Sequence, residues 1–563
     1  MPPGCETTTV CTMTTAADTA LLDRARAWVT EDPDPTTRSE LEQIIADVEG
    51  GADGSDLADR FAGTLEFGTA GLRGALGAGP NRMNRVVVTR AAAGLAAYLR
   101  DQNVKRGASV VIGYDARHNS DVFARDTAEV MTGAGLRALV LPRPLPTPVL
   151  AFAIRELGCA AGVMVTASHN PPQDNGYKVY LGDGSQIVPP ADVEIAEQIA
   201  AVGAMAEVPR GDAGTVLSEE IVDSYLDTVA GLVGDGPRDL TTVYTPLHGV
   251  GGTSVIQVLE TAGFEPPHVV AHQEEPDPEF PTVAFPNPEE PGAMDLAMAL
   301  ADETGADLVV ANDPDADRCA AAVPGPHGWR MLRGDEVGAL LAHHLLGAGK
   351  EGVYATSIVS SSLLGKMAAA AGEPYAETLT GFKWIGRLDG LAFGYEEALG
   401  YCVDPEHVRD KDGVSALLLL CEVAAAAKAA GRTLDDLLDD IATEYGLHAT
   451  DQLSVRVTDL AEIGAAMERL RATPPTELGG LPVKGIDDLA EGSDALPPTD
   501  GLRYRLAEDA RVIVRPSGTE PKIKCYLEVV VPVHPDDGVE AARIAAVGRL
   551  DALRNDIKLA AGI

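Results

Sequence analysis

Three carboxylates stand at alternate positions in the segment Asp313-Pro314-Asp315-Ala316-Asp317-Arg318, which follows a strand expected at 307–311. Side chains two residues apart in an extended segment point the same way, so these carboxylates should converge on one point. Repulsion would make that arrangement costly without a cation. Because Mg²⁺ prefers carboxylates, phosphate oxygens and water as ligands, the segment predicts a magnesium site.

Two other structures could explain the same three aspartates. A calcium-binding EF-hand loop also begins D-x-D-x-D, but it needs glycine at position six and glutamate at position twelve. Arg318 and Pro324 stand there, which excludes the EF-hand. The remaining alternative is an acidic surface turn without a ligand.

A serine follows a second apolar run, in Thr166-Ala167-Ser168-His169-Asn170-Pro171 after 162–165. The run predicts a buried strand that Asn-Pro ends, so Ser168 should lie on a turn at the end of the strand. A rigid strand would present its hydroxyl as a nucleophile. An ordinary turn has the same residue types, and that alternative stays open. The segment is neither a G-x-S-x-G nor a P-loop.

Three further segments could bind anions or sugars. The glycine-rich turn 67–74 carries one charge, that of Arg73, and 515–524 combines an arginine, two hydroxyls, a glycine and two lysines in the manner of a phosphate cradle. Glu396 stands on a glycine-bounded loop and could accept hydrogen bonds from vicinal sugar hydroxyls. The alternative is a connecting loop for 67–74, a hairpin turn for 515–524 and the start of a helix for the segment of Glu396. The charges of 409–412 are interpreted as the solvated start of a helix, with no catalytic role.

The elements that must hold these segments repeat along the chain. A strand, a loop, an apolar-periodic helix and a second strand begin near 110, again near 242 and again near 353. Unrelated strand–loop–helix–strand units are the alternative. We predict an α/β protein of three similar mixed α/β domains and a C-terminal α+β domain, preceded by two helices on either side of 32–35. The expected domains are 1–210, 211–325, 326–448 and 449–563.

The composition is that of a soluble globular protein rather than a nucleic-acid or membrane protein. The net charge of −41 would repel nucleic acid and anionic membranes, so an anionic substrate needs a locally basic cleft. The N-terminal residues lack the pattern of a signal peptide or a membrane span. Seven scattered cysteines without a C-x-x-C pair disfavour a disulfide framework and a zinc site and favour the reduced thiols of a cytoplasmic protein. The expected oligomeric state, a monomer or weak homodimer, does not follow from these features.

Taken together, the motifs resemble those of the α-D-phosphohexomutase superfamily, in the same order and over nearly all of the chain after residue 60. The resemblance rests on F-G-T-x-G-x-R-G at 67–74, the serine loop with its continuation to Lys178, and D-x-D-x-D-R at 313–318. It also rests on the glutamate loop 394–401 and on R-P-S-G-T-E-P-K at 515–522. It implies a four-domain phosphohexomutase architecture.

The resemblance also implies a reaction and roles for particular residues. A phosphosugar mutase would interconvert sugar 1-phosphate and 6-phosphate, of glucose with mannose as a further candidate, through a phosphoserine and a bisphosphorylated intermediate, with Mg²⁺ and with glucose 1,6-bisphosphate as activator. The implied catalytic residues are Ser168, Arg73, His169, Lys178 and Lys383. The implied metal ligands are Ser168, Asp313, Asp315 and Asp317. The implied substrate-binding residues are Arg318, Thr380, Gly381, Glu396, Arg515, Ser517, Gly518, Thr519 and Lys524.

One position departs from the family pattern. The sugar loop reads G-E-x-S in the family, but Ala398 occupies the serine position here. The segment E-E-A-x-G-Y resembles the branch with phosphopentomutases and glucose 1,6-bisphosphate synthases, which stay as alternatives. A non-catalytic phosphosugar-binding protein is disfavoured because the serine, the three aspartates, Arg73 and Arg515 occur together.

Overall fold

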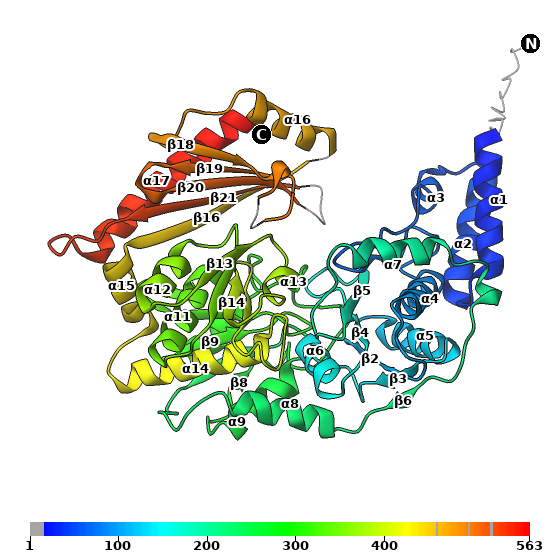
Figure 1. Ribbon diagram of the computed structural model, residues 1–563, viewed down its shortest axis with the longest axis horizontal. Helices are drawn as coiled ribbons and strands as arrows, with labels where there is room; N and C mark the ends of the chain where they lie inside the picture. Colours follow the sequence, from blue (N-terminus) through cyan, green and yellow to red (C-terminus); the bar gives the residue numbers. More distant parts are fainter. Residues whose placement is uncertain (1–15, 458–459, 494–495, 518–521) are drawn as a thin grey trace, which may run out of the picture. The chain divides into compact units, whose positions relative to one another are not determined.

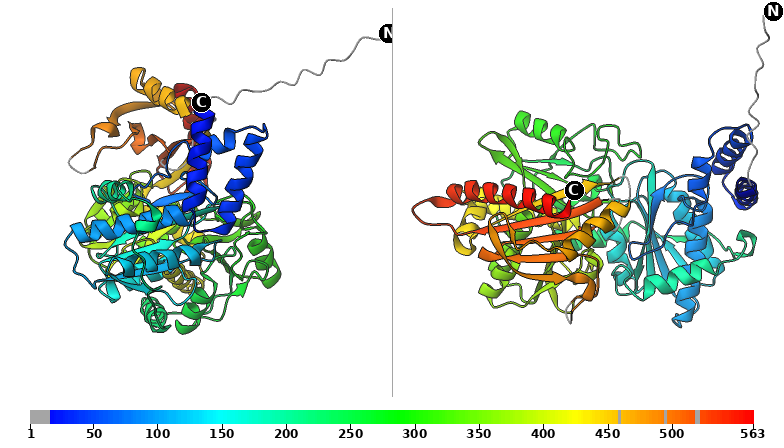
Figure 2. Two further views of the ribbon diagram at one scale, coloured as in Figure 1. Left: turned by 90° about the vertical axis from the view of Figure 1, so that its right-hand side faces the viewer. Right: turned by 90° about the horizontal axis from the view of Figure 1, so that it is seen from above.

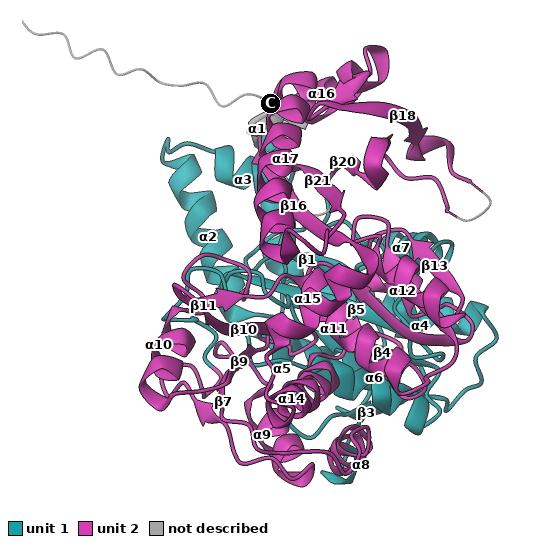
Figure 3. Ribbon diagram, turned by 90° about the vertical axis from the view of Figure 1, so that its left-hand side faces the viewer, with its two compact units in different colours: residues 1–221, 277–286 teal, residues 222–276, 287–563 magenta. Residues whose placement is uncertain are grey.

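The computed structural model describes residues 16–457, 460–493, 496–517 and 522–563. These residues divide into two compact units, which Figure 3 shows in different colours. The first unit comprises 1–221 together with 277–286, and the second comprises 222–276 together with 287–563.

The first unit is built on a six-stranded sheet in the order β1-β5-β4-β2-β3-β6. Strands β2, β3, β4 and β6 are parallel; β5 pairs antiparallel with β4 at one edge, and β1 pairs antiparallel with β5 beyond it. The buried apolar sequences of β2 and β4 suit strands covered on both faces. The elements are β1 (Leu72–Ala75), α4 (Arg85–Asp101), β2 (Ser109–Tyr114), α5 (Ser120–Gly133), β3 (Arg137–Val140), α6 (Thr147–Glu156), β4 (Ala161–Val165), β5 (Asp174–Leu181), α7 (Ala191–Ala200) and β6 (Thr215–Val216).

Three helices precede this sheet, α1 (Ala16–Glu31), α2 (Pro35–Glu49) and α3 (Ser55–Arg60). The expected pair of helices on either side of 32–35 is confirmed. Asp34 caps α2 by accepting from the Thr36 amide, and Pro35 occupies the first turn, where no amide donor is needed. Trp28 and Phe61 pack edge to face in the small core of these helices.

The second unit begins with two α/β sheets. The five-stranded sheet runs β11-β10-β9-β7-β8 and the four-stranded sheet runs β13-β12-β14-β15. The first contains α8 (Glu220–Ala230), β7 (Thr242–Thr245), α9 (Gly252–Thr261), β8 (His268–Val269), α10 (Asp295–Thr304), β9 (Leu308–Ala311), β10 (Ala320–Gly325) and β11 (Gly328–Met331). The next contains α11 (Gly334–Gly347), β12 (Val353–Ser357), α12 (Leu363–Ala371), β13 (Tyr375–Thr378), α13 (Phe382–Ile385), β14 (Leu391–Glu396), β15 (Gly400–Cys402), α14 (Gly413–Ala429) and α15 (Leu434–Tyr445).

The last sheet is antiparallel, in the order β16-β21-β20-β19-β18-β17. The long helix α17 lies along it in Figure 2 and, with α16, closes a core on one face. This confirms the expected α+β domain. The elements are β16 (Leu447–Arg456), α16 (Leu460–Ala472), β17 (Glu477–Leu478), β18 (Leu481–Asp488), β19 (Leu502–Leu506), β20 (Arg511–Pro516), β21 (Lys522–Val531) and α17 (Gly538–Ala561).

The three α/β sheets share one strand arrangement, which confirms the expected repeat. Each contains a parallel set and then one antiparallel strand, in the orders β3-β2-β4-β5, β8-β7-β9-β10 and β13-β12-β14-β15. The connection before the antiparallel strand carries the serine in the first sheet, the three aspartates in the second and, in the third, Glu397 directly after Glu396 at the end of β14. Three chemically different loops therefore occupy equivalent positions.

No single helix among the described residues is long and apolar enough to cross a membrane; α14 and α15, which meet at 91°, reach that length and composition only as a bent pair. The cysteines at 159, 319, 402, 421 and 525 are buried free thiols, as expected. Cys5 and Cys11 lie outside the described residues.

Candidate active site

Ser168 lies on a turn directly after β4, as the sequence predicted. Its backbone has a positive φ of 53°, and the turn is closed by hydrogen bonds from the Ser168 amide to Thr166 Oγ1 (2.9 Å) and from the Asn170 amide to the Ala167 carbonyl (3.1 Å). Its Oγ lies 3.2 Å from His169 Nδ1. The side chain is buried, so a reacting group on Oγ would be held at one place.

A buried arginine holds this turn, and sequence reasoning missed it. Arg117 donates to the carbonyl oxygens of Ser168 (2.6 Å), Asn170, Pro171 (2.9 Å) and Asp174 (3.2 Å). The sequence feature that could have identified Arg117 is the charged pair in Asp115-Ala116-Arg117, directly after the buried strand β2. A charged pair at the end of a parallel strand faces the ends of the neighbouring strands.

Asp115 in turn fixes Arg117. Its carboxylate lies 3.4 Å from Arg117 Nε and accepts from the Arg117 amide (3.0 Å) and from Ser120 Oγ (2.6 Å). Burial raises the pKa of Asp115, while the guanidinium of Arg117 and the hydroxyl of Ser120 oppose that rise. The pair is therefore a buried structural support for the serine turn.

Arg73 and Lys178 come to the same end of the sheet as Ser168. Strand β5 pairs with β4, with Lys178 opposite Met164, and β1 pairs with β5, with Arg73 opposite Gly176. Arg73 Nη1 donates to Asn170 Oδ1 (3.2 Å). The sequence placed Arg73 in a glycine-rich turn, but the turn ends at Gly71 and Arg73 lies on β1.

The end of that turn requires glycine. Gly71 has φ +76°, and a Cβ there would lie 1.8 Å from the Tyr177 carbonyl oxygen, so β1 could not approach β5 with a larger residue. Ser168, His169, Arg73 and Lys178 are thus brought together within the first unit.

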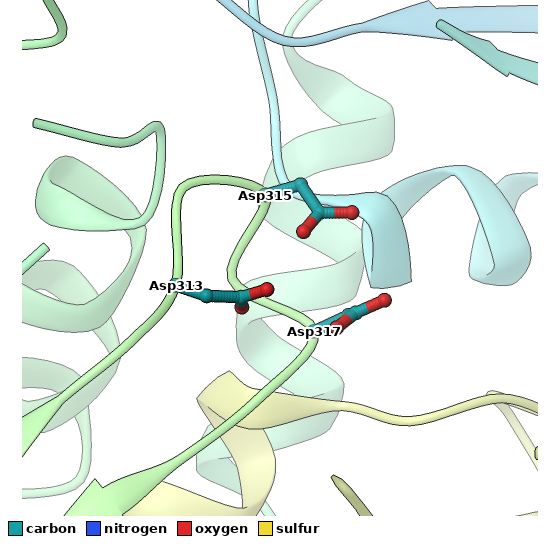
Figure 4. Close-up of side chains that lie close together, drawn as sticks. All are labelled: Asp313, Asp315 and Asp317. Carbon is teal, nitrogen blue, oxygen red and sulfur yellow. The ribbon is translucent and has the colours of Figure 1, made fainter. Parts of the chain in front are cut away.

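The three aspartates form a buried cluster in the second unit, shown in Figure 4. One carboxylate oxygen from each of Asp313, Asp315 and Asp317 lies within 4.8 Å of the others. The convergence that the sequence predicted is confirmed, but its reason differs. The segment is a turn, with Ala316 at φ 53° and its amide bonded to the Asp313 carbonyl (2.8 Å), rather than an extended strand.

This cluster fits a divalent cation. Three hard oxygen donors gather at one point, and buried carboxylates are stable as anions only beside compensating charge. Glycines let the surrounding chain approach the turn closely, since a Cβ at Gly249 would lie 2.3 Å from Pro314 Cα and one at Gly413 2.2 Å from the Arg318 carbonyl oxygen. The alternative of an exposed acidic turn is excluded by the burial.

Two protein cations lie at the edge of the cluster. Lys411 Nζ lies 3.0 Å from Asp317 Oδ2 and 3.6 Å from Asp410 Oδ1, and Arg318 Nε lies 3.8 Å from Asp313 Oδ2. Burial opposes the charged form of Lys411, but Asp317 and Asp410 outweigh it and raise its pKa. The interpretation of 409–412 as a solvated helix start is therefore wrong. Helix α14 does begin there, but Asp410 and Asp412 are buried and the largely covered Lys411 pairs with Asp317 of the aspartate turn.

The predicted sugar loop forms its own cluster. Glu396 Oε1 accepts from the Gly381 amide (2.7 Å), which brings Glu396 to Thr380, Gly381 and Lys383 at the start of α13. Gly381 has φ +107°. The ring of Phe382 lies 5.8 Å from Lys411 Nζ, so the same helix reaches the aspartate cluster. Glu396 therefore lies beside the partly buried start of α13.

The neighbouring Glu397 faces a different set of partners. Its carboxylate accepts from Ser360 Oγ (3.0 Å) and Ser357 Oγ (3.2 Å). Burial, together with Glu396 and Asp335, raises the pKa of Glu397 to about 7. The sequence offered two adjacent glutamates, and only the fold distinguishes their surroundings.

The C-terminal segment places its cations on one hairpin. Arg515 on β20 is opposite Lys524 on β21, and the Ser517 amide donates to the Lys522 carbonyl (2.8 Å). The Tyr526 hydroxyl contacts Arg515. Gly518 and Thr519, also predicted for this segment, lie outside the described residues.

Comparison with known proteins decides the family. Models of the phosphoglucomutase/phosphomannomutase α/β/α domains I, II and III match residues 64–205, 223–326 and 333–445, and the model of the C-terminal domain matches 453–545. The chain belongs to the phosphoglucomutase/phosphomannomutase family. This phosphomutase is thus an isomerase that transfers a phosphoryl group within a sugar phosphate.

Relatives of this phosphomutase carry several substrate names. The chain is 51% identical over 455 residues to a probable phosphomannomutase of Haemophilus influenzae, covering 79% of this chain and 93% of the relative. It is 36% identical over 570 residues to a phosphopentomutase of Homo sapiens, covering 91% and 92%. A putative phosphomannomutase from Thermus thermophilus has a similar structure, with a TM-score of 0.70, 27% identity and coverage of 88% and 99%.

The ammonium of Lys411 should matter for stability when no divalent cation is bound. We expect Lys411→Met to lower the free energy of unfolding in EDTA by about 3 kcal/mol, because it removes one partner of a buried ion pair. Urea unfolding measures this. The matched control is Lys428→Met, whose exposed pair with Asp307 should contribute less than about 1 kcal/mol. Equal losses in the two variants would contradict a special role for Lys411.

Proposed function

We propose that this phosphomutase interconverts the 1-phosphate and 6-phosphate of glucose, with mannose phosphate as a second hexose substrate. The observation that carries the proposal is the repeat. Equivalent loops of three sheets supply a buried serine turn, a buried carboxylate cluster and a carboxylate beside the start of α13. A hydroxyl that accepts a phosphoryl group, a cation site and a ligand for sugar hydroxyls are the parts that such a reaction needs.

In the proposed reaction, phosphorylated Ser168 gives its phosphoryl group to a hydroxyl of the sugar monophosphate. The bond from phosphorus to Ser168 Oγ breaks and a bond from phosphorus to the sugar oxygen forms. A base takes the proton of the sugar hydroxyl, and an acid gives a proton to the departing Ser168 Oγ, so that the serine hydroxyl is restored. The resulting bisphosphate turns over and returns its other phosphoryl group to Ser168. His169 Nδ1 lies 3.2 Å from Ser168 Oγ, which makes His169 one candidate for the base; Lys178 and Lys383 are the others.

Asp313, Asp315 and Asp317 would hold Mg²⁺, which supplies neutralisation of charge on the phosphoryl oxygens when bound. Arg515, Ser517 and Lys524 would bind the phosphate that is not being transferred, and Arg73 would lie beside the phosphoserine. Glucose 1,6-bisphosphate would act as activator by phosphorylating Ser168. The acidic composition and the free thiols support a cytoplasmic enzyme that binds no nucleic acid. A monomer or weak homodimer is part of the proposal.

A pentose substrate is the second candidate, favoured by a specific observation. Ala398 stands where the resemblance implies a serine, so one hydroxyl contact to a hexose is missing. Turnover of ribose 1-phosphate would then exceed that of glucose 1-phosphate.

The deciding experiment compares kcat/KM for glucose 1-phosphate and ribose 1-phosphate, with Mg²⁺ and trace glucose 1,6-bisphosphate. A clear preference for glucose 1-phosphate supports the hexose proposal, and a preference for ribose 1-phosphate replaces it with a phosphopentomutase. Turnover of neither would overturn both, leaving bisphosphate synthesis or phosphosugar binding without turnover.

The missing hydroxyl can be restored. We expect Ala398→Ser to raise kcat/KM for glucose 1-phosphate relative to ribose 1-phosphate by roughly tenfold, because one added hydrogen bond to a substrate hydroxyl contributes on the order of 1 kcal/mol. Ala472→Ser, at the exposed end of α16, is the matched control and should leave the ratio unchanged. An unchanged ratio in Ala398→Ser would show that this position does not select the sugar.

A further inference from the structure

One short segment of the second α/β domain belongs to the unit that holds the serine turn. Residues 277–286 lie in the first compact unit, although the chain on both sides of them lies in the second. In the sequence, this segment lies between β8 and α10, in the domain that carries the aspartate cluster. Its central aromatic residue, Phe280, is 2% exposed.

Phe280 covers the arginine that holds the serine turn. The guanidinium carbon of Arg117 lies 4.8 Å from the centre of the Phe280 ring, a cation–π distance. The same guanidinium donates to the carbonyl of Ser168 and to three further carbonyls of its loop. Asp115 contacts the guanidinium as well. The ring therefore lies against the side chain of Arg117, which gathers these carbonyls.

The backbone of Phe280 is held in an unusual conformation. Its φ is 45°, which is costly for a bulky residue and persists only where the surroundings impose it. The Phe280 amide donates to the Asp277 carbonyl and the Val283 amide donates to the Phe280 carbonyl, both at 3.1 Å. Glu279 next to it pairs with His118, which follows Arg117 in the chain. The segment is thus fixed at two adjacent points beside Arg117.

We propose that Phe280 is a positioning residue for Ser168. Its ring holds the guanidinium of Arg117, and Arg117 sets the carbonyls that fix the serine turn. The inference rests on the proposed function of Ser168 as the phosphoryl carrier. Because 277–286 is joined covalently at both ends to the aspartate-bearing domain, that domain supplies both a cation site and a support of the serine turn.

The test uses three variants of the full-length enzyme. Phe280→Leu removes the aromatic face, Phe280→Trp keeps it, and Phe264→Leu removes a matched cation–π contact, since Arg238 also lies 4.8 Å from the ring of Phe264 in the second unit. Each is phosphorylated with glucose 1,6-bisphosphate. Single-turnover transfer to glucose 6-phosphate is timed, KM is measured, and amide hydrogen exchange is followed in peptides spanning 162–176.

We expect Phe280→Leu to slow the transfer step roughly tenfold with little change in KM, and to speed exchange in 162–176 by a similar factor. Phe280→Trp should keep the transfer rate and the amide exchange in 162–176 close to those of wild type, and Phe264→Leu should alter neither quantity. Transfer and exchange within twofold of wild type in Phe280→Leu would overturn the proposal, as would equal effects in Phe264→Leu. If wild-type Ser168 takes up no phosphoryl group, the proposed function fails, and the exchange comparison still decides the role of Phe280.

Discussion

Ser168→Ala should lower kcat/KM by at least about 10⁴-fold on whichever sugar phosphate the enzyme prefers, because it removes the atom that carries the phosphoryl group. Wild-type enzyme incubated with glucose 1,6-bisphosphate should gain the mass of one phosphoryl group, and Ser168→Ala should gain none. Steady-state kinetics and intact-protein mass spectrometry measure the two effects. The fold should survive, since Arg117 binds the backbone carbonyl of Ser168, which the substitution keeps.

Ser254→Ala is the matched control for this substitution. Ser254 is also buried, and its Oγ forms no hydrogen bond to the residues that the structure describes. It should retain both turnover and phosphorylation. If Ser168→Ala kept more than a tenth of wild-type turnover, or still took up one phosphoryl group, another residue would be the carrier and the proposed reaction would be wrong.

The second large effect concerns the aspartate cluster. Removing divalent cations with EDTA should lower turnover by about 10³-fold or more, and added Mg²⁺ should restore it. Asp315→Asn keeps the size of the side chain but removes one of three buried charges. We expect it to weaken Mg²⁺ binding, so that the Mg²⁺ concentration that gives half-maximal turnover rises by roughly 10-fold to 100-fold.

The same variant should have the opposite effect on stability. Three buried carboxylates within 4.8 Å repel one another in the absence of a cation. In EDTA, Asp315→Asn should therefore raise the unfolding temperature, by an amount equivalent to about 1–2 kcal/mol, while the exposed control Asp223→Asn should change neither property. A loss of stability in EDTA would mean that the cluster is held by its protein partners and is not a cation site.

Gain of stability with loss of activity is the signature of a site whose residues are arranged for chemistry rather than for folding. Lys411 provides the complementary case. It stabilises the cluster when no divalent cation is bound, so its removal and that of Asp315 should shift stability in opposite directions. The two variants measured in one buffer would separate repulsion among the carboxylates from their attraction to Lys411.

The positions of the chemical loops could be predicted from the sequence because the determinants are local. An apolar run followed by Ser168 or by Asp313 identifies a strand end, and the strand ends of α/β sheets are where side chains meet a ligand. The threefold repeat could also be predicted, since helix and strand periodicities reflect local burial. In the aspartate segment, the predicted convergence of the three carboxylates was correct although the backbone is a turn and not an extended strand. Alternate side chains can also meet across a tight turn.

The supports of those loops could not be predicted, because they depend on contacts between residues far apart in the chain. Lys411 looked like the solvated start of a helix, and only packing of that helix start against the aspartate turn buries it. Arg117 lies 51 residues before Ser168, and Phe280 belongs to another domain of the sequence. Local periodicity carries no information on such pairs. The sequence by itself determined which atoms can do chemistry, and the tertiary structure decided which charges and rings hold them in place, because burial and long-range contact exist only once the chain is folded.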